Sequence, residues 1–249
     1  MEEHFFKFSN LSKFPEVIHG FSKRNYGSMK FGDLPPEKVI ENRQHFFKEL
    51  GIDIADIIAA NLAHGSEITT VGLNEKGRGS LEPTSAIPAT DGLITSQAGI
   101  YLMATFADCL PIMVYDPSAQ VVALIHGGWR SIIDQIVPKL IDKMKNLGSE
   151  VENFIVGIGP GICQKHFVVK DDVLAKFKAK YPSMIFVRNK DGYIDLKKAV
   201  VSDLRKSGVP KENLEVASEC TVCLNGIYGS FRKEGDQTIY QAAILGMKK

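Results

Sequence analysis

Cys109 and His126 are the two side chains whose types and surroundings most directly suggest chemistry. Cys109 follows an acid, Asp108, in the segment 107–111, and His126 precedes two glycines, a tryptophan and an arginine in the segment 126–130. A lone cysteine is most often a small buried hydrophobe, but glycines beside a histidine allow a ligand to approach the backbone closely. Thiolate and imidazole together bind zinc or copper, and they also form the nucleophile pairs of cysteine hydrolases.

The sequence between these two segments predicts a β-hairpin that brings them together. Residues 112–125 contain two apolar strands around an Asp-Pro-Ser-Ala turn. We place Tyr115 opposite Gln120. That antiparallel register sets Cys109 opposite His126, and directly opposed Cβ atoms lie about 5 Å apart. We therefore expect the thiol and the imidazole to meet at the open end of the hairpin.

His64 is a third candidate ligand. It precedes Gly65 at the entrance to a predicted strand, residues 67–71. A lone histidine is usually an ordinary surface or core residue, so its weight comes from the other two candidates. Three protein ligands with one open position form the usual catalytic zinc site, in which bound water is acidified. Trp129 and Arg130 would add a stacking surface and an anion-binding fork beside such a site.

Two further motifs carry weaker signals. Residues 157–161 form a Gly-Ile-Gly-Pro-Gly loop that could present N–H groups to an anion, although it is neither a Walker A loop nor a dinucleotide fingerprint. Cys220 and Cys223 form a Cys-x-x-Cys pair that no second pair follows, so the sequence does not predict a closed structural zinc site. Cys163 could be a reactive thiol or a packing residue.

Length and charge exclude several classes of protein. The 249 residues suffice for one large domain or two small ones, and 30 basic against 29 acidic side chains give no sign of a nucleic-acid or anionic-membrane partner. No apolar run approaches the roughly 20 residues that span a bilayer, and residues 1–6 lack the features of a secretory signal. Four cysteines in this length favour reduced thiols in a cytoplasmic enzyme over a disulfide framework.

Hydrophobic periodicity predicts the elements that position these side chains. Residues 72–90 predict a long loop, and Pro138 should kink or restart the helix that follows Arg130. Strands and helices mix around an antiparallel pair, which indicates an α+β (layered α/β) fold with mixed, partly antiparallel β-sheets flanked by helices. The expected helices are 36–50, 132–148, one capped by Asp171 or Asp172, and one from Asp195 to 208; the expected strands are 67–71, 93–95, 101–105, 112–115, 120–125, 154–158, 214–217 and 239–245.

In its motifs the sequence resembles the YfiH-like family, long labelled laccase-domain or polyphenol oxidoreductases and more recently understood as purine nucleoside phosphorylases. Asp-Cys-x-Pro followed by His-x-Gly-Trp-Arg is the specific part of the match, and the motifs keep their order over nearly the whole chain. The matching segments are 20–24, 41–43, 63–65, 91–95, 107–111, 126–130, 158–162, 220–221 and 231–235.

The resemblance implies a single YfiH-like metal-dependent domain over residues 1–249, with mixed sheets flanked by helices. It implies a metal, zinc in most accounts of the family and copper in older ones, held by His64, Cys109 and His126. It also implies phosphorolysis of adenosine, inosine and methylthioadenosine, with some deamination of adenosine. The partners would then be a small-molecule nucleoside and phosphate, while the oligomeric state stays open.

These two reactions require particular residue types. Phosphorolysis needs an anion site and stabilisation of an oxocarbenium-like transition state, whereas deamination needs an acidified water and a proton-carrying carboxyl group. We expect catalysis from Asp108, Asp91 and Arg130. We expect substrate or phosphate binding from Arg24, Lys30, Trp129, Arg130 and Gly159.

Other functions stay open on the residues alone. A metal-free cysteine hydrolase or amidase would use Cys109 as nucleophile and His126 as base. Copper-dependent polyphenol oxidation is a second alternative, which a total of six histidines disfavours. A non-enzymatic binding protein is a third, because the sequence departs from the family pattern at Leu62, Lys30 and Tyr240.

Overall fold

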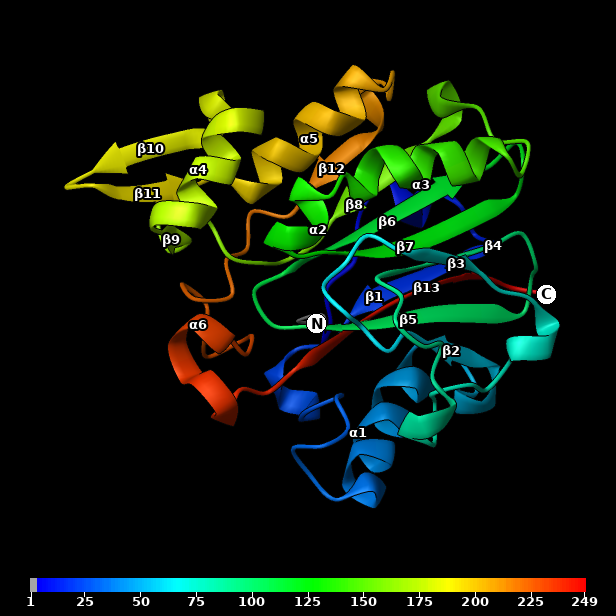
Figure 1. Ribbon diagram of the computed structural model, residues 1–249. Helices are drawn as coiled ribbons and strands as arrows, with labels where there is room; N and C mark the ends of the chain where they lie inside the picture. Colours follow the sequence, from blue (N-terminus) through cyan, green and yellow to red (C-terminus); the bar gives the residue numbers. More distant parts are fainter. Residues whose placement is uncertain (1–3) are drawn as a thin grey trace.

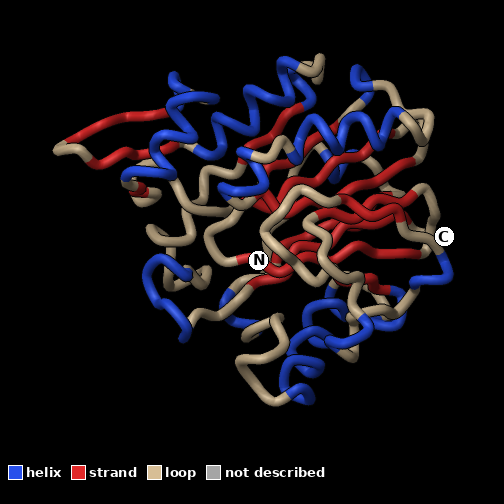
Figure 2. Tube along the Cα trace, in the orientation of Figure 1, coloured by secondary structure: helices blue, strands red, loops and turns tan. Residues whose placement is uncertain are grey.

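The computed structural model describes residues 4–249; residues 1–3 of the expected 1–249 domain lie outside the described residues. Two large sheets pack face to face, with helices on the outer face of each (Figure 1). Figure 2 shows the strands gathered in the middle of the molecule and the helices around them. The expected layered fold with mixed sheets is confirmed. No helix within residues 4–249 combines the length and apolarity that crossing a membrane requires.

The six-stranded sheet carries the predicted hairpin at its centre. Its two central strands pair antiparallel, whereas the outermost pair at each edge is parallel. The strand order is β12 (Leu214–Val216), β8 (Ile155–Ile158), β6 (Leu110–Asp116), β7 (Val121–Gly127), β4 (Gly92–Thr95) and β3 (Ile68–Thr70).

The four-stranded sheet covers one face of the six-stranded sheet, and a small third sheet lies at the side. The four-stranded sheet has the order β1 (Val17–Phe21), β13 (Gln241–Met247), β5 (Ile100–Phe106) and β2 (Ile57–Ala59), and the third has the order β10 (Ile185–Arg188), β11 (Asp191–Ile194) and β9 (Val168–Val169).

The helices cover the outer faces of this sandwich. The first packs on the four-stranded sheet, while the second, third and fifth pack on the six-stranded sheet (Figure 1). Short 3-10 turns occupy several of the loops. The helices are α1 (Pro36–Glu49), α2 (Trp129–Ile133), α3 (Ile136–Lys145), α4 (Asp171–Lys180), α5 (Leu196–Lys206) and α6 (Phe231–Glu234).

Strand β6 shows why the central strands contain almost no polar residues. Ile112 and Val114 pack against the helices, whereas Met113 and Tyr115 pack between the two sheets. Both faces of the strand are therefore buried, and the sequence pattern becomes a continuous apolar run in place of alternation. This double burial fixes the hairpin that positions the candidate site.

The hairpin forms, but the predicted register is wrong by two residues. Tyr115 pairs with Val122 in place of Gln120, and His126 pairs with Pro111. The turn lies one residue later than expected because the carboxylate of Asp116 accepts the N–H groups of residues 118 and 119 from within the strand. A shift of two residues leaves every side chain on its predicted face.

The expected helices form with two corrections. The helix after Arg130 is divided at Gln135, which has a left-handed backbone (φ 63°), and Pro138 then lies in the first turn of α3, so the helix restarts. Asp171 does not cap α4, because Lys170 occupies the N-cap position without a side-chain hydrogen bond. Asp195 does cap α5, accepting the N–H of residue 198 at 2.9 Å.

Candidate metal centre

His64, Cys109 and His126 converge as the sequence predicted. One ligand atom from each lies within 4.8 Å of the others, and the two imidazole rings meet edge to face with centroids 5.1 Å apart. His126 comes from β7, Cys109 immediately precedes β6, and His64 lies in the loop between β2 and β3. Since His126 pairs with Pro111, Cys109 reaches it as a diagonal neighbour on the same face of the sheet.

The three candidate ligands leave one side of the cluster accessible. His126 is buried, Cys109 is partly buried and His64 is exposed. Gly128 makes room on the other side, because a Cβ there would lie 3.4 Å from the Cys109 sulfur and 3.6 Å from the His64 ring. A set of one thiolate and two imidazoles with an accessible side fits the donor pattern of a catalytic zinc site.

Asp91 holds two of the ligands from behind. Its carboxylate accepts the backbone N–H groups of Ala63, His64 and Gly65 at 3.3, 2.9 and 2.7 Å, and one oxygen lies 3.3 Å from Nδ1 of His126. His64 has a left-handed backbone (φ 56°), a strained conformation for a residue with a side chain. Asp91 therefore stabilises the turn that presents His64 and orients the imidazole of His126, as carboxylates behind metal-binding histidines do.

The charges of the cluster favour an ionised thiol. Burial disfavours the Cys109 thiolate, but the electrostatic and hydrogen-bonding effects of His126 and His64 outweigh burial and lower the pKa of Cys109. Burial likewise disfavours the charged form of His126, but Cys109 and Asp91 raise the pKa of that imidazole. The thiolate is the form of cysteine that binds metals and attacks carbonyl carbons.

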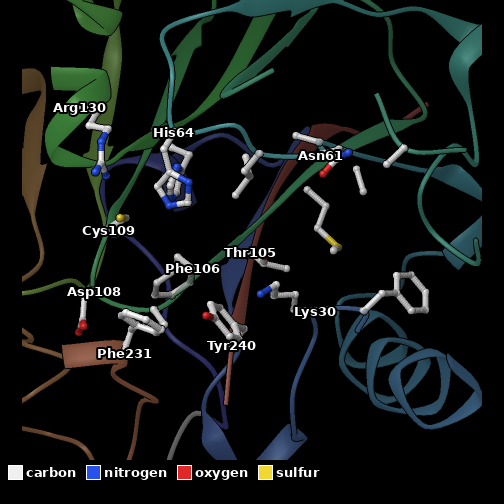
Figure 3. A pocket seen from close by; sticks show the side chains of 18 of the residues that line it. Lys30, Asn61, His64, Thr105, Phe106, Asp108, Cys109, Arg130, Phe231 and Tyr240 are labelled. Atoms are coloured by element: carbon white, nitrogen blue, oxygen red, sulfur yellow. The ribbon is translucent and has the colours of Figure 1, made fainter. Parts of the chain in front are cut away.

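A cavity of about 590 Å³ opens onto the cluster. Its volume lies in the range of small-molecule sites. In Figure 3, His64 and Cys109 lie on one side with Arg130 near them, and aromatic side chains form the opposite wall. The labelled residues in that view are Lys30, Asn61, His64, Thr105, Phe106, Asp108, Cys109, Arg130, Phe231 and Tyr240.

Three of the predicted substrate-binding residues line this cavity: Lys30, Trp129 and Arg130. The guanidinium of Arg130 lies 4.3 Å from the Trp129 ring centroid, and the Lys30 ammonium lies 4.3 Å from the Tyr240 ring centroid. Within residues 4–249 neither cation has an ion-pair partner. Both are therefore available to an anionic ligand.

The structure does not bring Arg24 or Gly159 to the cavity. Arg24 forms an ion pair with Glu234 at 2.6 Å and donates to the carbonyl of residue 225 at 2.8 Å. The N–H of Gly159 donates to the carbonyl of Pro111 at 2.8 Å, and a Cβ at this glycine would lie 2.6 Å from the Phe21 ring. The Arg24 guanidinium and the Gly159 N–H therefore already have partners within the protein, and glycine at position 159 makes room for the Phe21 ring. The phosphate role expected for these two residues has no support from this cavity.

The two predicted catalytic carboxylates lie in different surroundings. Asp108 lines the cavity, with its oxygens accepting from Thr221 at 2.5 Å and from the N–H of Arg232 at 2.6 Å. Asp91 is buried behind His126 and does not line the cavity. Of the two, only Asp108 has direct access to a bound ligand.

Sequence reasoning missed the aromatic wall. Phe106, Phe231 and Tyr240 line the cavity, and so does Arg232, whose guanidinium donates to the carbonyl of His166 at 2.7 Å. The family-like motif 231–235 was the available signal for two of them, but nothing in the local pattern assigned them to the same cavity as Cys109.

The chain is similar in sequence and in structure to several known proteins. The chain is 28% identical to the purine nucleoside phosphorylase YlmD of Bacillus subtilis, covering 94% of this chain and 90% of that protein. It is 30% identical to the adenosine deaminase RL5 of an unknown prokaryotic organism, covering 80% and 78%. The crystal structure of the Bacillus licheniformis hypothetical protein YfiH superposes with a TM-score of 0.90, at 26% identity and 94% coverage of both chains. The model of the multi-copper polyphenol oxidoreductase laccase family matches residues 14–248, and the chain therefore belongs to that family.

Proposed function

We propose that this protein is a metal-dependent purine nucleoside phosphorylase that acts on adenosine, inosine and methylthioadenosine, with deamination of adenosine as a second activity. The observation that carries the proposal is the cluster of His64, Cys109 and His126 at the edge of a cavity with aromatic and cationic walls. Relatives named purine nucleoside phosphorylase and adenosine deaminase support both reactions.

Zinc is the metal that we propose for this site, because one thiolate and two imidazoles are typical ligands of catalytic zinc. His64, Cys109 and His126 would hold it. Asp91, which the sequence predicted to transfer protons, would instead orient His64 and His126. When bound, zinc supplies Lewis-acid and water-acidifying chemistry. Copper remains the alternative that the family's name suggests.

The remaining cavity residues would bind the nucleoside and the phosphate. Phe231 and Tyr240 offer ring faces against which a purine can stack. Arg130 lies beside the candidate metal ligands and offers a fork of N–H donors to phosphate, while Lys30 lies at the opposite wall. In phosphorolysis a phosphate oxygen attacks the anomeric carbon as its bond to the purine breaks. Asp108 is the cavity carboxyl group that we assign to proton transfer.

A metal-free cysteine hydrolase is the second candidate function, and one observation favours it. Cys109 contacts His126, which in turn contacts Asp91 at 3.3 Å, in the order nucleophile, base and orienting carboxylate. Metal content separates the two candidates, since only the phosphorylase requires a bound ion. Polyphenol oxidation has less support, because the two candidate metal clusters within residues 4–249 contain only three histidines.

We further propose that residues 1–249 form one domain in the cytoplasm, with no nucleic-acid partner. A family match over residues 14–248 supports the single domain. Four free cysteines, three of them at least partly exposed, support a reducing compartment.

Product analysis tests the proposed function. Purified protein is incubated with adenosine, inosine or methylthioadenosine, with and without phosphate, and the products are separated by chromatography. We expect free base and sugar phosphate only when phosphate is present, and inosine from adenosine in its absence. His126→Ala should lose both reactions, whereas the matched control His45→Ala, at an exposed histidine of α1, should keep them. Absence of every product with the wild-type protein would refute the proposal.

A further inference from the structure

Cys163, His166, Cys220 and Cys223 form a second cluster of potential metal ligands. One ligand atom from each lies within 4.8 Å of the other three. No second pair follows Cys220 and Cys223 in the sequence, but in the structure Cys163 and His166, which precede them, complete the cluster. β8 and β12 are parallel neighbours, so the loops that follow them leave the sheet at the same edge and bring the two pairs together.

The distances within this cluster match a tetrahedron around zinc. Nδ1 of His166 lies 3.3 Å from the sulfur of Cys163, 3.7 Å from that of Cys220 and 3.5 Å from that of Cys223. Zinc–sulfur bonds of about 2.3 Å and zinc–nitrogen bonds of about 2.0 Å at tetrahedral angles place sulfur and nitrogen about 3.5 Å apart. One imidazole nitrogen carries a single proton or a single lone pair, so hydrogen bonding accounts for only one of the three contacts.

Backbone N–H groups also point at the sulfurs. The N–H of His166 hydrogen-bonds Cys163, and the N–H of Cys223 hydrogen-bonds Cys220, so each pair forms the same four-residue turn. The N–H of Cys163 adds a further bond of 3.3 Å to the Cys220 sulfur and links the two turns. Together these donors hold both turns with their sulfurs facing the imidazole of His166.

We propose that these four side chains bind a second zinc ion in a closed Cys3His site. With four protein ligands no position is left for water or substrate, so the site is structural. Three thiolates exceed the charge of the ion by one, and Lys197 lies close by to balance it. Its ammonium donates to the carbonyls of Ala217 and Glu219 at 2.5 and 2.9 Å, in the segment that leads into Cys220.

The second site would brace one wall of the cavity. Thr221, between two of the ligands, donates to Asp108, the residue before Cys109, at 2.5 Å. The guanidinium of Arg232 donates to the carbonyl of His166 at 2.7 Å, and the backbone N–H of Arg232 donates to Asp108 at 2.6 Å. Losing the ion would therefore loosen the loop that carries α6 and its cavity residues, without removing any ligand of the first site.

Metal counting on the full-length protein tests this proposal. We expect two zinc ions per chain in the wild-type protein and one in His166→Ala. The matched control is Lys165→Ala, which changes an exposed neighbour in the same turn and should keep two. Equal zinc content in these two variants, with both folded by circular dichroism, would overturn the proposal.

A second variant isolates the site if His166→Ala fails to fold. Cys109→Ser combined with His126→Ala removes the first cluster and leaves the second intact. X-ray absorption of this variant should report one zinc bound by three sulfurs at about 2.3 Å and one nitrogen at about 2.0 Å. A zinc-free double variant, or a disulfide between Cys220 and Cys223 in protein kept under reductant, would contradict the assignment. Neither result depends on whether the protein turns over nucleosides.

Discussion

Replacing Asp91 with asparagine is the sharpest single test of how the first metal site is built. One Asp91 oxygen accepts the N–H of His64 at 2.9 Å and faces Nδ1 of His126, and the other accepts the N–H groups of Ala63 and Gly65. An asparagine amide keeps only one acceptor oxygen. In either orientation of the amide, its NH2 group would face two donors and could not accept a hydrogen bond from either.

The magnitude follows from those lost bonds. Hydrogen bonds to a charged acceptor are each worth about 1.5–3 kcal/mol, but the exposed loop around His64 can open to water and recover part of that energy. Carboxylates that orient metal-bound histidines typically contribute about 10–100-fold to metal affinity. We therefore expect the zinc Kd of Asp91→Asn to rise by about 10–100-fold, which corresponds to about 1.4–2.7 kcal/mol.

Chelator competition measures this change directly. The matched control is Glu67→Gln, which removes the same charge from an exposed side chain in the segment that follows His64. This variant should leave the zinc Kd unchanged. Saturating zinc should restore most of the turnover lost in Asp91→Asn if Asp91 acts by positioning ligands. A zinc Kd within twofold of the wild-type value would refute the positioning role, and lost turnover that excess zinc does not restore would instead indicate proton transfer by Asp91.

Three further predictions concern residues around the site and in the core. His19 is buried and accepts the N–H of residue 8, and burial lowers its pKa to about 4, so the unfolded chain takes up its proton first as the pH falls. Between pH 6.5 and 4 the free energy of unfolding should therefore fall by up to about 3 kcal/mol more in the wild-type protein than in His19→Gln, measured by urea denaturation. Gly159→Ala should cost about 1–3 kcal/mol of stability by overpacking against Phe21 while leaving the KM for phosphate unchanged; a raised KM would restore the phosphate role of this loop. Arg130→Gln should raise the KM for phosphate at least about tenfold, a loss of about 1.4 kcal/mol, whereas Arg24→Gln should lower stability and leave that KM unchanged; the reverse pattern in steady-state kinetics would contradict the cavity assignment.

Two of the three ligands of the first cluster, Cys109 and His126, could be placed together from sequence because their signals were local. Cys109 and His126 flank one hairpin, so a register error of two residues still leaves them near each other on the same face. The actual register differs by two residues, and the contact changes from directly opposite to diagonal. His64 lay beyond such reasoning, since the loop that presents it depends on Asp91, which follows it by 27 residues.

The rest of the site depends on contacts between distant segments. The aromatic wall comes from β5 and from the segment that leads into β13. These two strands are neighbours in one sheet, and their pairing could not be predicted from local sequence patterns. Arg24 was a reasonable phosphate ligand by residue type, but Glu234, 210 residues away, already binds it. The Cys-x-x-Cys pair looked incomplete because its partners lie 57 residues earlier in the chain. The parallel pairing of β8 with β12 brings the two pairs together, and no local sequence pattern predicts that pairing.

Zinc titration of metal-stripped protein tests the central claim most directly. The claim is that a metal ion held by His64, Cys109 and His126 is required for nucleoside turnover. Phosphate-dependent cleavage of adenosine should be absent after removal of metal and should return when zinc is added back. His126→Ala should not recover at any zinc concentration. Full turnover by wild-type protein from which all metal has been removed would contradict the claim.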